Sequence, residues 1–506
     1  MKYPIGIQDF RELREGGYVY VDKTKTLFNI LQQGGGYYHL HRPRRFGKSL
    51  LLSTMNELYR GNRELFEGLW IDNHWNWEGM QRPVIWLKFS SFKYKGNDLK
   101  KAIQEGIEEV AAGLNIALDH GAFVNPLQDL IQKAYNQYGQ KVVLLIDEYD
   151  KPIIDYLDEP GQAEANRDIL KWLYSILKDS DPYLELVFIT GVSAFSKVSI
   201  FSDLNNLYNL SLVAAARTLL GITQDELEHY FAEPLARVDK AKVRQWYNGY
   251  SWGGTEKVYN PFSILSFFQG GGEYSNFWFE TGTPTFLIRE MKKRAYYFPE
   301  RIEVSQNKIN AFDLTRLDPI SVLFQTGYLT ILKYEPEDHL YTLDYPNMEV
   351  RQSMEQSLLH EYLEGPIQDP LARVAGLRNA LREGDIEGMV RIINALFASM
   401  PYDLWPQQQT ERFFHSIIHL TFDLLGTYIR SEVHTANGRC DALVETADRI
   451  YALEFKLDKS AAEALQQIFD KGYLQPYADS PKQRVAVGMN FSSEERAVVA
   501  WESEGI

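Results

Sequence analysis

The stretch that most constrains the fold is KVVLLID, a continuous apolar run at residues 141–147 that ends in an acidic residue. A strand with one face in water alternates apolar and polar residues, so an uninterrupted run predicts a strand buried on both faces. Strands of that kind belong to parallel sheets covered by helices. LELVFITGVS and YYHLH predict further strands, as does PVIWLKFSSF at residues 83–92. Helix-like segments alternate with them, as α/β architecture requires.

A second constraint is HRPRRFGKSLLL, in which a turn connects a strand-like run to a helical segment. In a phosphate-binding loop, backbone N–H groups and a helix N-terminus surround the phosphates, a lysine adds positive charge, and the next hydroxyl binds Mg²⁺. The sequence therefore predicts that Gly47, Lys48 and Ser49 bind a nucleotide, with Ser49 at the metal. Arg42 stands where such a loop usually carries its first glycine. We expect the turn to depend on Pro43 and Gly47 instead.

Acidic and polar residues end the two longest buried strands. Asp147 and Glu148 follow the first strand, and Thr190 ends the second, with Ser193 as the alternative. The carboxyl ends of parallel strands face one crevice, which is the usual ligand site of an open sheet. We expect Asp147 to bind Mg²⁺, Glu148 to activate the attacking water and Thr190 to contact the terminal phosphate. In the structural alternative, the two acidic residues only begin a turn and cap a helix.

Arg44 and Arg45 lie inside the same loop. Either guanidinium could bind phosphate oxygens as an arginine finger supplied by the chain itself. Either could equally lie on a solvated face of the loop or pair with a carboxylate. We do not expect HRPRRFGK to bind DNA, because the loop already serves its own phosphates.

The most informative C-terminal stretch is RCDALVETADRIYALEFKL, in which two strand-like runs flank a turn. Residues i and i+2 of a strand point to the same face, so Glu454 and Lys456 project together, and a hairpin returns Asp441 close to them. Two adjacent carboxylates bind a hard divalent cation such as Mg²⁺, with Mn²⁺ as an alternative. A nearby lysine can orient or deprotonate a water for attack on a phosphodiester. The spacing predicts a metal-dependent nuclease centre, and an ordinary surface hairpin is the structural alternative.

Helical segments on either side of this hairpin offer further candidates. Glu411 could supply another metal ligand, and Gln466 or Gln467 could reach the scissile phosphate. Each could instead belong to an ordinary helix surface. His415 and His419 share a helix face, but HSIIH lacks the glutamate of a metalloprotease helix, so we do not expect a zinc site.

Composition limits the class of protein. The 506 residues favour about two to four domains, and no stretch reaches the roughly 18 apolar residues of a membrane span. The single cysteine, Cys440, excludes an intramolecular disulfide framework and is typical of a reducing cytoplasm. The net charge of −15 argues against nonspecific coating of nucleic acid and leaves room for a local basic groove.

Several longer motifs together resemble a known family. They are RPRRFGKSLLLSTM, LLIDEYDKPI, ITGVSAFSKVSIFSDLNNL, WYNGYSW, YNPFSIL and GRCDALVETADRIYALEFKLDKSAAEALQQI. Over nearly its whole length, the chain resembles bacterial proteins that join an AAA-ATPase-like domain to a C-terminal nuclease domain of the PD-(D/E)XK superfamily. Arg-Pro-Arg-Arg typically precedes Phe-Gly-Lys-Ser in that family, so Arg42 looks like a family feature.

The resemblance also implies roles for individual residues. It places Lys48 and Ser49 at the phosphates and Mg²⁺, with Asp147 and Glu148 as the acidic pair. It maps the metal and catalytic positions of the nuclease onto Asp441, Glu454 and Lys456. Cys440 stands where related domains often have an aliphatic residue or a proline, which leaves the metal ligands intact.

These observations predict an α/β protein with four parts. The first is a P-loop NTPase domain of AAA type, with a parallel sheet and helices, at residues 1–235. A lid or winged-helix-like region follows at 236–346, and a helical connector at 347–405. A restriction-endonuclease-like α/β domain occupies 406–506, and RVAVGMNF is its last expected strand.

The leading functional hypothesis is a cytoplasmic ATPase whose nucleotide state controls a Mg²⁺-dependent nuclease acting on DNA or RNA. The alternative is a nucleotide-dependent switch or scaffold whose C-terminal domain binds nucleic acid or protein without cleaving it. AAA-type ATPases often form rings in which a neighbour's arginine completes the site, so a homo-oligomer is a further expectation. Arg44 or Arg45, acting within the chain, would remove that need. We expect no membrane partner.

Overall fold

The computed structural model describes residues 1–34, 36–119, 125–193, 200–201, 204, 206–279, 287–289, 291, 301–310, 318–362, 370–398, 417–418, 420–422, 424–425, 430–432 and 440–506. The chain divides into two compact units. Unit 1 comprises Met1–Thr283 and Glu300–Val350, and unit 2 comprises Pro284–Pro299 and Arg351–Ile506. In the described ranges, no helix is long and apolar enough to cross a membrane.

Unit 1 is built on a parallel sheet of five strands in the order β2-β3-β4-β1-β5. The strands are β1 (Tyr37–His41), β2 (Val84–Lys88), β3 (Val142–Asp147), β4 (Leu184–Gly191) and β5 (Tyr208–Asn209). Every residue of β3 is buried, which explains its uninterrupted apolar sequence. The predicted N-terminal parallel sheet is confirmed.

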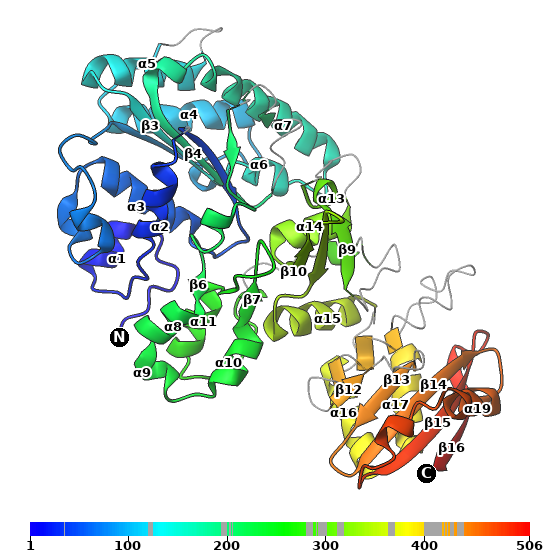
Figure 1. The fold of residues 1–506 in the computed structure, drawn as a ribbon. Helices are drawn as coiled ribbons and strands as arrows, with labels where there is room; N and C mark the ends of the chain where they lie inside the picture. Colours follow the sequence, from blue (N-terminus) through cyan, green and yellow to red (C-terminus); the bar gives the residue numbers. More distant parts are fainter. Residues whose placement is uncertain are drawn as a thin grey trace. The chain divides into compact units, whose positions relative to one another are not determined.

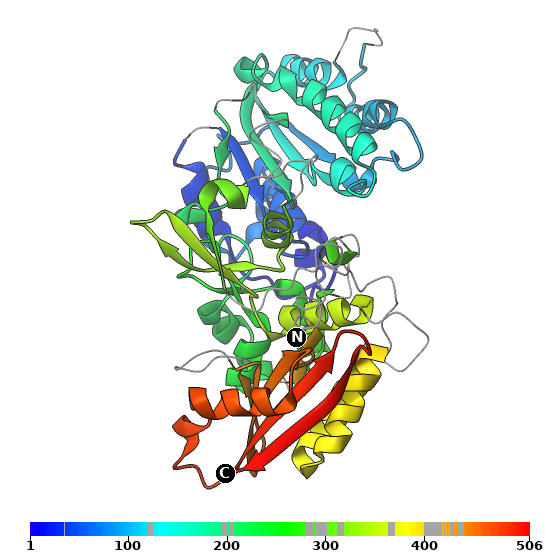
Figure 2. The same cartoon turned by 90° about the vertical axis from the view of Figure 1, so that its right-hand side faces the viewer.

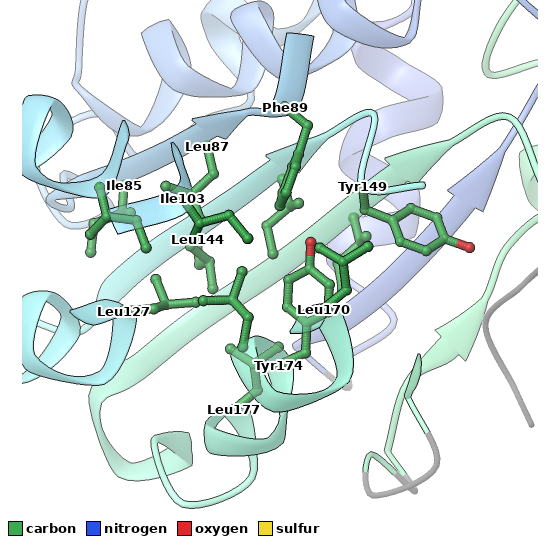
Figure 3. Packing of buried hydrophobic residues seen from close by; sticks show 14 of the residues in the cluster. Ile85, Leu87, Phe89, Ile103, Leu127, Leu144, Tyr149, Leu170, Tyr174 and Leu177 are labelled. Carbon is green, nitrogen blue, oxygen red and sulfur yellow. The ribbon is translucent and has the colours of Figure 1, made fainter. Parts of the chain in front are cut away.

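Helices cover both faces of this sheet (Figures 1 and 2). They are α1 (Phe10–Glu15), α2 (Thr24–Leu31), α3 (Lys48–Tyr59), α4 (Leu99–Gly113), α5 (Pro126–Tyr138), α6 (Lys151–Ile154) and α7 (Pro160–Tyr174). Figure 3 shows Leu127 of α5 and Leu170 of α7 packed near Leu144 of β3, within a large buried cluster that also contains side chains of α4. Helix α3 contacts β2, β3 and β4. The packing of these helices on the sheet fixes the positions of the strand ends and of the N-terminus of α3.

The middle of the chain forms two small antiparallel sheets with helices, in the orders β6-β8-β7 and β10-β11-β9. The strands are β6 (Ile222–Thr223), β7 (Asn248–Tyr250), β8 (Val258–Tyr259), β9 (Ile302–Ser305), β10 (Thr330–Glu335) and β11 (Leu340–Asp344). The helices are α8 (Gln224–Tyr230), α9 (Ala232–Leu235), α10 (Lys240–Tyr247), α11 (Pro261–Gln269), α13 (Gln306–Asn310) and α14 (Pro319–Thr326). These described elements belong to unit 1. The domain limits given above remain predictions.

Three helices precede the C-terminal sheet: α15 (Met348–Tyr362), α16 (Pro370–Glu383) and α17 (Ile386–Ala398). The sheet is mixed and has the order β12-β13-β14-β15-β16. Its strands are β12 (Arg430–Glu432), β13 (Ala442–Glu445), β14 (Arg449–Leu457), β15 (Gln483–Ser492) and β16 (Ala497–Gly505). Helix α19 (Ala461–Lys471) packs on β14 and β15, and α17 packs on β16. The predicted C-terminal α/β fold is confirmed.

Two expected elements differ in extent from the structure. The strand predicted for residues 83–92 ends at Lys88, because Phe89–Ser91 form a 3₁₀ turn in which the Ser91 hydroxyl donates to the carbonyl of Lys88 at 2.7 Å. The last strand is β16, which follows the run that we expected to end the sheet.

Candidate functional sites

The predicted phosphate loop connects β1 to α3 in unit 1. Gly47, directly before the helix, has φ 93°, and Arg45 has φ 66°. Glycine adopts this left-handed backbone without the steric cost that a Cβ brings. The turn brings the loop onto the N-terminus of α3, where backbone N–H groups lack helical partners and favour anions.

Lys48 is buried at the start of α3, and its ammonium group contacts the loop itself. Nζ donates to the carbonyl oxygens of Arg42 at 2.8 Å and Pro43 at 2.9 Å. Burial lowers the pKa of Lys48, while the charges of Asp147 and Glu148 oppose that shift. A cation held between the loop carbonyls and the acidic end of β3 is suited to bind phosphate oxygens.

Arg42, which replaces the usual first glycine, is only 1% exposed. Its guanidinium donates to the carbonyls of His41 at 2.9 Å, Ser211 at 2.8 Å and Ala216 at 3.1 Å. It also lies 3.8 Å from the ring centroid of Trp252. Burial lowers the pKa of Arg42 to about 9. The Arg42 side chain therefore anchors the loop to the surrounding protein and does not supply a positive charge for binding a ligand.

The ends of β3 and β4 lie together, as adjacent parallel strands require. The Thr190 hydroxyl donates to Oδ1 of Asp147 at 2.7 Å. Glu148 has φ 54°, an uncommon value for a residue with a side chain and one often found at functional sites. Burial raises the pKa of Glu148, Asp147 raises it further, and Lys48 opposes both. A carboxylate with a raised pKa is better suited to accept a proton near neutral pH.

Asp150 also stabilises this region, although the sequence patterns did not identify it. It is buried, and its Oδ2 accepts hydrogen bonds from the N–H of Val192 at 2.9 Å, the N–H of Ser193 at 2.6 Å and the Ser193 hydroxyl at 2.6 Å. Burial raises its pKa, although the hydrogen bonds from Ser193 oppose that shift. Asp150 thus joins the turn after β3 to the turn after β4. Its position in DEYD was the available signal, but spacing alone did not distinguish it from a helix cap.

A cavity of about 360 Å³ lies over the loop. The predicted site residues in its wall are Arg44, Arg45, Gly47, Lys48, Ser49 and Glu148. Lys151 also lines it, and the opposite wall comes from residues 4–8 and from α11. The guanidinium of Arg45 lies 5.2 Å from the ring centroid of Phe262. The structure therefore brings six of the predicted nucleotide-site residues around one cavity, while Asp147 and Thr190 bond to each other at the strand ends.

A smaller cavity of about 100 Å³ shares Gly47 and Pro261 with the first. Its wall is mostly apolar and includes Val21, Phe46 and Leu220. Lys23 also lines it, but its ammonium group is engaged by Glu226 at 2.6 Å and by the carbonyl of Thr218 at 2.9 Å. The space beside the phosphate loop thus suits an apolar or flat group.

The second predicted site lies in unit 2, where β13 and β14 form the expected antiparallel hairpin. Asp441 precedes β13, and its Oδ2 accepts a hydrogen bond from the N–H of Phe455 at 2.8 Å. Nζ of Lys456 lies 3.3 Å from Oε1 of Glu454. The structure therefore brings Asp441, Glu454 and Lys456 together at one point of the sheet.

Glu454 is only 3% exposed, and Gln467 of α19 donates to its Oε1. Burial raises the pKa of Glu454 to about 7, with Asp441 adding to the shift and Lys456 opposing it. Its other oxygen, Oε2, is buried without a hydrogen-bond donor among the described residues. A buried carboxylate oxygen without a donor, beside a second carboxylate, fits a divalent cation.

Not all candidates of this centre join it. Gln466 donates to Asp470 at 2.9 Å, so of the two glutamines it is Gln467 that contacts Glu454. Glu411, His415 and His419 lie outside the described residues. The described ranges contain no cluster of three or more acidic, histidine or cysteine side chains that could hold a metal.

Comparisons with known proteins support the two domain types. Residues 4–201 match the family model described as "Predicted AAA-ATPase", and residues 409–501 match that of the PD-(D/E)XK nuclease superfamily. The chain is 38% identical, over 100% of its own length and 99% of the relative's, to a protein of Azotobacter chroococcum mcd 1 named "Uncharacterized protein in vnfD 5'region". The chain therefore belongs to the family of this protein, in which an AAA-ATPase-like domain is joined to a C-terminal PD-(D/E)XK nuclease-like domain.

Proposed function

We propose that this protein binds and hydrolyses ATP in unit 1, and that its nucleotide state controls a Mg²⁺-dependent nuclease centre in unit 2 that cleaves DNA or RNA. The observation that carries the proposal is the presence of two arrangements suited to phosphate chemistry in one chain. One is the cavity between the phosphate loop and Glu148. The other is the buried Glu454 beside Asp441 and Lys456.

In the nucleotide site, the N–H groups after Gly47 and the ammonium group of Lys48 bind the phosphates. Ser49 and Asp147 would hold the accompanying Mg²⁺, and Thr190 orients Asp147 through their hydrogen bond. The flat base of the nucleotide occupies the apolar cavity beside Gly47. This assignment is supported by the continuity of that cavity with the phosphate loop.

Hydrolysis requires a group that accepts a proton from water near the terminal phosphate. Glu148 lines the cavity, and its raised pKa suits that role. Arg44 and Arg45 are exposed in the wall of the same cavity, where their charges can stabilise phosphate oxygens. An arginine from a second copy of the chain is then not required for the site, although a homo-oligomer remains compatible with it.

In the nuclease centre, Asp441 and Glu454 would hold the divalent cation. A bound Mg²⁺ or Mn²⁺ supplies charge stabilisation at the reacting phosphate. Lys456 orients the attacking water through its ammonium group, which lies 3.3 Å from Oε1 of Glu454. Gln467 fixes the carboxylate of Glu454 through its hydrogen bond. Glu411 is a further proposed ligand.

Cleavage of labelled single-stranded DNA, double-stranded DNA and RNA, with Mg²⁺ or Mn²⁺ and with or without ATP, tests this function. Glu454→Gln keeps the size of the side chain but removes its charge, and should reduce cleavage by about a hundredfold. Gln466→Ala, on the exposed side of α19, is the matched control and should cleave normally. Cleavage that Glu454→Gln leaves unchanged would refute the nuclease assignment.

The nucleotide half has its own test. Lys48→Ala should abolish ATP binding measured by calorimetry, because it removes the cation of the loop. Lys141→Ala, an exposed position just before β3, is the control and should bind ATP as the unaltered protein does. Retained affinity in Lys48→Ala would refute the assignment of the loop.

A second candidate function is a nucleotide-dependent switch or scaffold whose C-terminal domain binds nucleic acid or protein without cleavage. Two observations favour it: the described residues hold no cluster of three or more metal ligands, and the net charge is −15. ATP-dependent binding to nucleic acid or protein, without cleavage under any of the metal conditions above, would support this second function over the first.

A further inference from the structure

The phosphate loop packs against a set of residues from the middle of unit 1 that we call the loop clamp: Tyr250, Trp252, Trp278 and Gly327. The ring of Phe46 lies 4.8 Å from that of Tyr250 and 5.5 Å from that of Trp252, measured between centroids. Aromatic pairs at such distances are well packed and stabilising. The loop is therefore held from the side as well as by β1 and α3.

Close contact extends to the other residues of the loop. Arg42 stacks on Trp252 at 3.8 Å. Gly327 lies so near Pro43 that a Cβ at this glycine would come within 2.6 Å of the proline ring. Because packed interiors respond to small displacements, a change in loop conformation must shift the loop clamp as well.

Trp278 is the member of the loop clamp that connects the loop to another element. Its indole Nε1 donates to the carbonyl of Arg44 at 3.0 Å, and its backbone N–H donates to Oε1 of Glu349 at 2.7 Å. Trp278 is 4% exposed and Glu349 is fully buried. Trp278 therefore donates one hydrogen bond to the phosphate loop and another to helix α15.

Glu349 lies at the start of helix α15, close to the boundary between the two units. Helix α15 begins at Met348, and its first residues belong to unit 1, whereas the residues from Arg351 onward belong to unit 2. A helix transmits a displacement along its axis because its backbone is continuously hydrogen-bonded. A displacement of Glu349 would therefore act at the start of a helix whose later residues belong to unit 2.

Arg44 is positioned to start such a movement. Its side chain lines the nucleotide cavity, while its own carbonyl accepts the hydrogen bond from Trp278. A phosphate bound by the Arg44 guanidinium would reorient this residue and with it the carbonyl. Arg44 thus carries both the contact with the ligand and the hydrogen bond from Trp278.

We propose that Trp278 is a positioning residue that couples the phosphate loop to α15, so that ATP in the loop changes the conformation of α15 and thereby regulates the C-terminal centre. The coupling runs from Arg44 through Trp278 to Glu349. This inference rests on the proposed function, because it assumes that the cavity over the loop binds ATP.

The direct readout is amide hydrogen exchange of α15, measured by mass spectrometry in the full-length protein with and without ATP and Mg²⁺. Trp278→Phe keeps an aromatic ring but removes the indole donor to Arg44. We expect its ATP affinity to stay within about threefold of the unaltered protein. We expect the ATP-dependent change in exchange at residues 348–362 to fall to less than about a third, together with the ATP dependence of cleavage.

Trp246→Phe is the matched control. Trp246 packs on Tyr247 and Tyr274 in the middle of unit 1, and should keep the full exchange response. Glu349→Gln, which weakens the acceptor for Trp278 while preserving its size, provides a second variant. Glu349→Gln should also reduce the ATP-dependent change in hydrogen exchange of α15.

The outcomes separate this inference from the proposed function. Failure of the unaltered protein to bind ATP would refute both. If ATP binds and changes the cleavage rate, but exchange in α15 does not respond or responds equally in Trp278→Phe, the coupling through Trp278 is refuted while the proposed function stands. Loss of the response in both Trp278→Phe and Glu349→Gln, with ATP binding retained, supports the coupling.

Discussion

At the scale of single residues, Arg42 has a role that sequence reasoning could not assign. A missing first glycine suggests a damaged loop, and only the family resemblance argued otherwise. Its guanidinium donates to the carbonyl of the neighbouring His41 and to those of Ser211 and Ala216, and it stacks on Trp252; the last three residues are more than 150 positions away. Contacts of that kind depend on the tertiary fold and leave no local periodicity in the sequence.

Replacement of Arg42 should therefore lower stability. Arg42→Ala leaves three buried carbonyls without their donor and should reduce the free energy of unfolding of unit 1 by about 3 kcal/mol. Arg60→Ala, at the exposed end of α3, should change it by no more than about 0.5 kcal/mol. Urea unfolding followed by tryptophan fluorescence measures both, and equal stability of the two variants would contradict this role.

Glu454 predicts a pH dependence of stability in metal-free protein. Its folded-state pKa of about 7 lies above the unfolded value of 4.5, so the folded state binds the proton more tightly. The resulting stabilisation, about 3 kcal/mol, is fully present below pH 4.5 and is lost as the pH rises through about 7. Melting temperatures in chelator at pH 5 and pH 8 should differ by less in Glu454→Gln. An equal difference in both proteins would contradict the buried carboxylate.

At the scale of elements, sequence patterns predicted the buried strands and the β13–β14 hairpin well. Continuous apolar runs predicted β3 and β4, and the spacing of Glu454 and Lys456 correctly placed both on one face of β14. Strand β16 was not predicted. Seven of its nine residues are exposed, which is typical of a strand at the edge of a sheet. The 3₁₀ turn after β2 depends on a hydrogen bond from Ser91, which apolar periodicity does not reveal.

Gly488 fixes how closely α19 approaches the nuclease sheet. It lies opposite Glu454 in the pairing of β14 with β15, and a Cβ at this position would collide with the backbone of Ala461 and Leu465 in α19. Gly488→Ala should displace the helix, withdraw Gln467 from Glu454 and destabilise the domain by about 2 kcal/mol. Cleavage should fall by tenfold or more, as on the order of an ångström of misplacement can cost.

Gly505→Ala is the control for that substitution. Gly505 also lies in this sheet, but a Cβ there would meet its neighbour only at 3.4 Å. The control should therefore fold and cleave normally. Normal cleavage by both variants would show that the close approach of α19 does not position the carboxylates.

At the scale of the whole molecule, the two proposed phosphate-chemistry sites lie in separate units of one chain. Sequence motifs were sufficient to predict the two domain types, because each site depends on a few residues at the ends of strands. The proposed connection between the sites could not be predicted from the sequence, because the hydrogen bonds of Trp278 to Arg44 and Glu349 belong to no recognisable motif. We propose that nucleotide binding at Lys48 determines the activity at Glu454.

One measurement tests that claim most directly: the rate of nucleic-acid cleavage as a function of ATP concentration, with ATP binding measured under the same conditions. We expect the cleavage rate to change with ATP concentration at the same midpoint as ATP binding. Lys48→Ala should cleave at a constant rate that does not depend on ATP concentration. Cleavage that stays constant while ATP saturates the unaltered protein would contradict the claim.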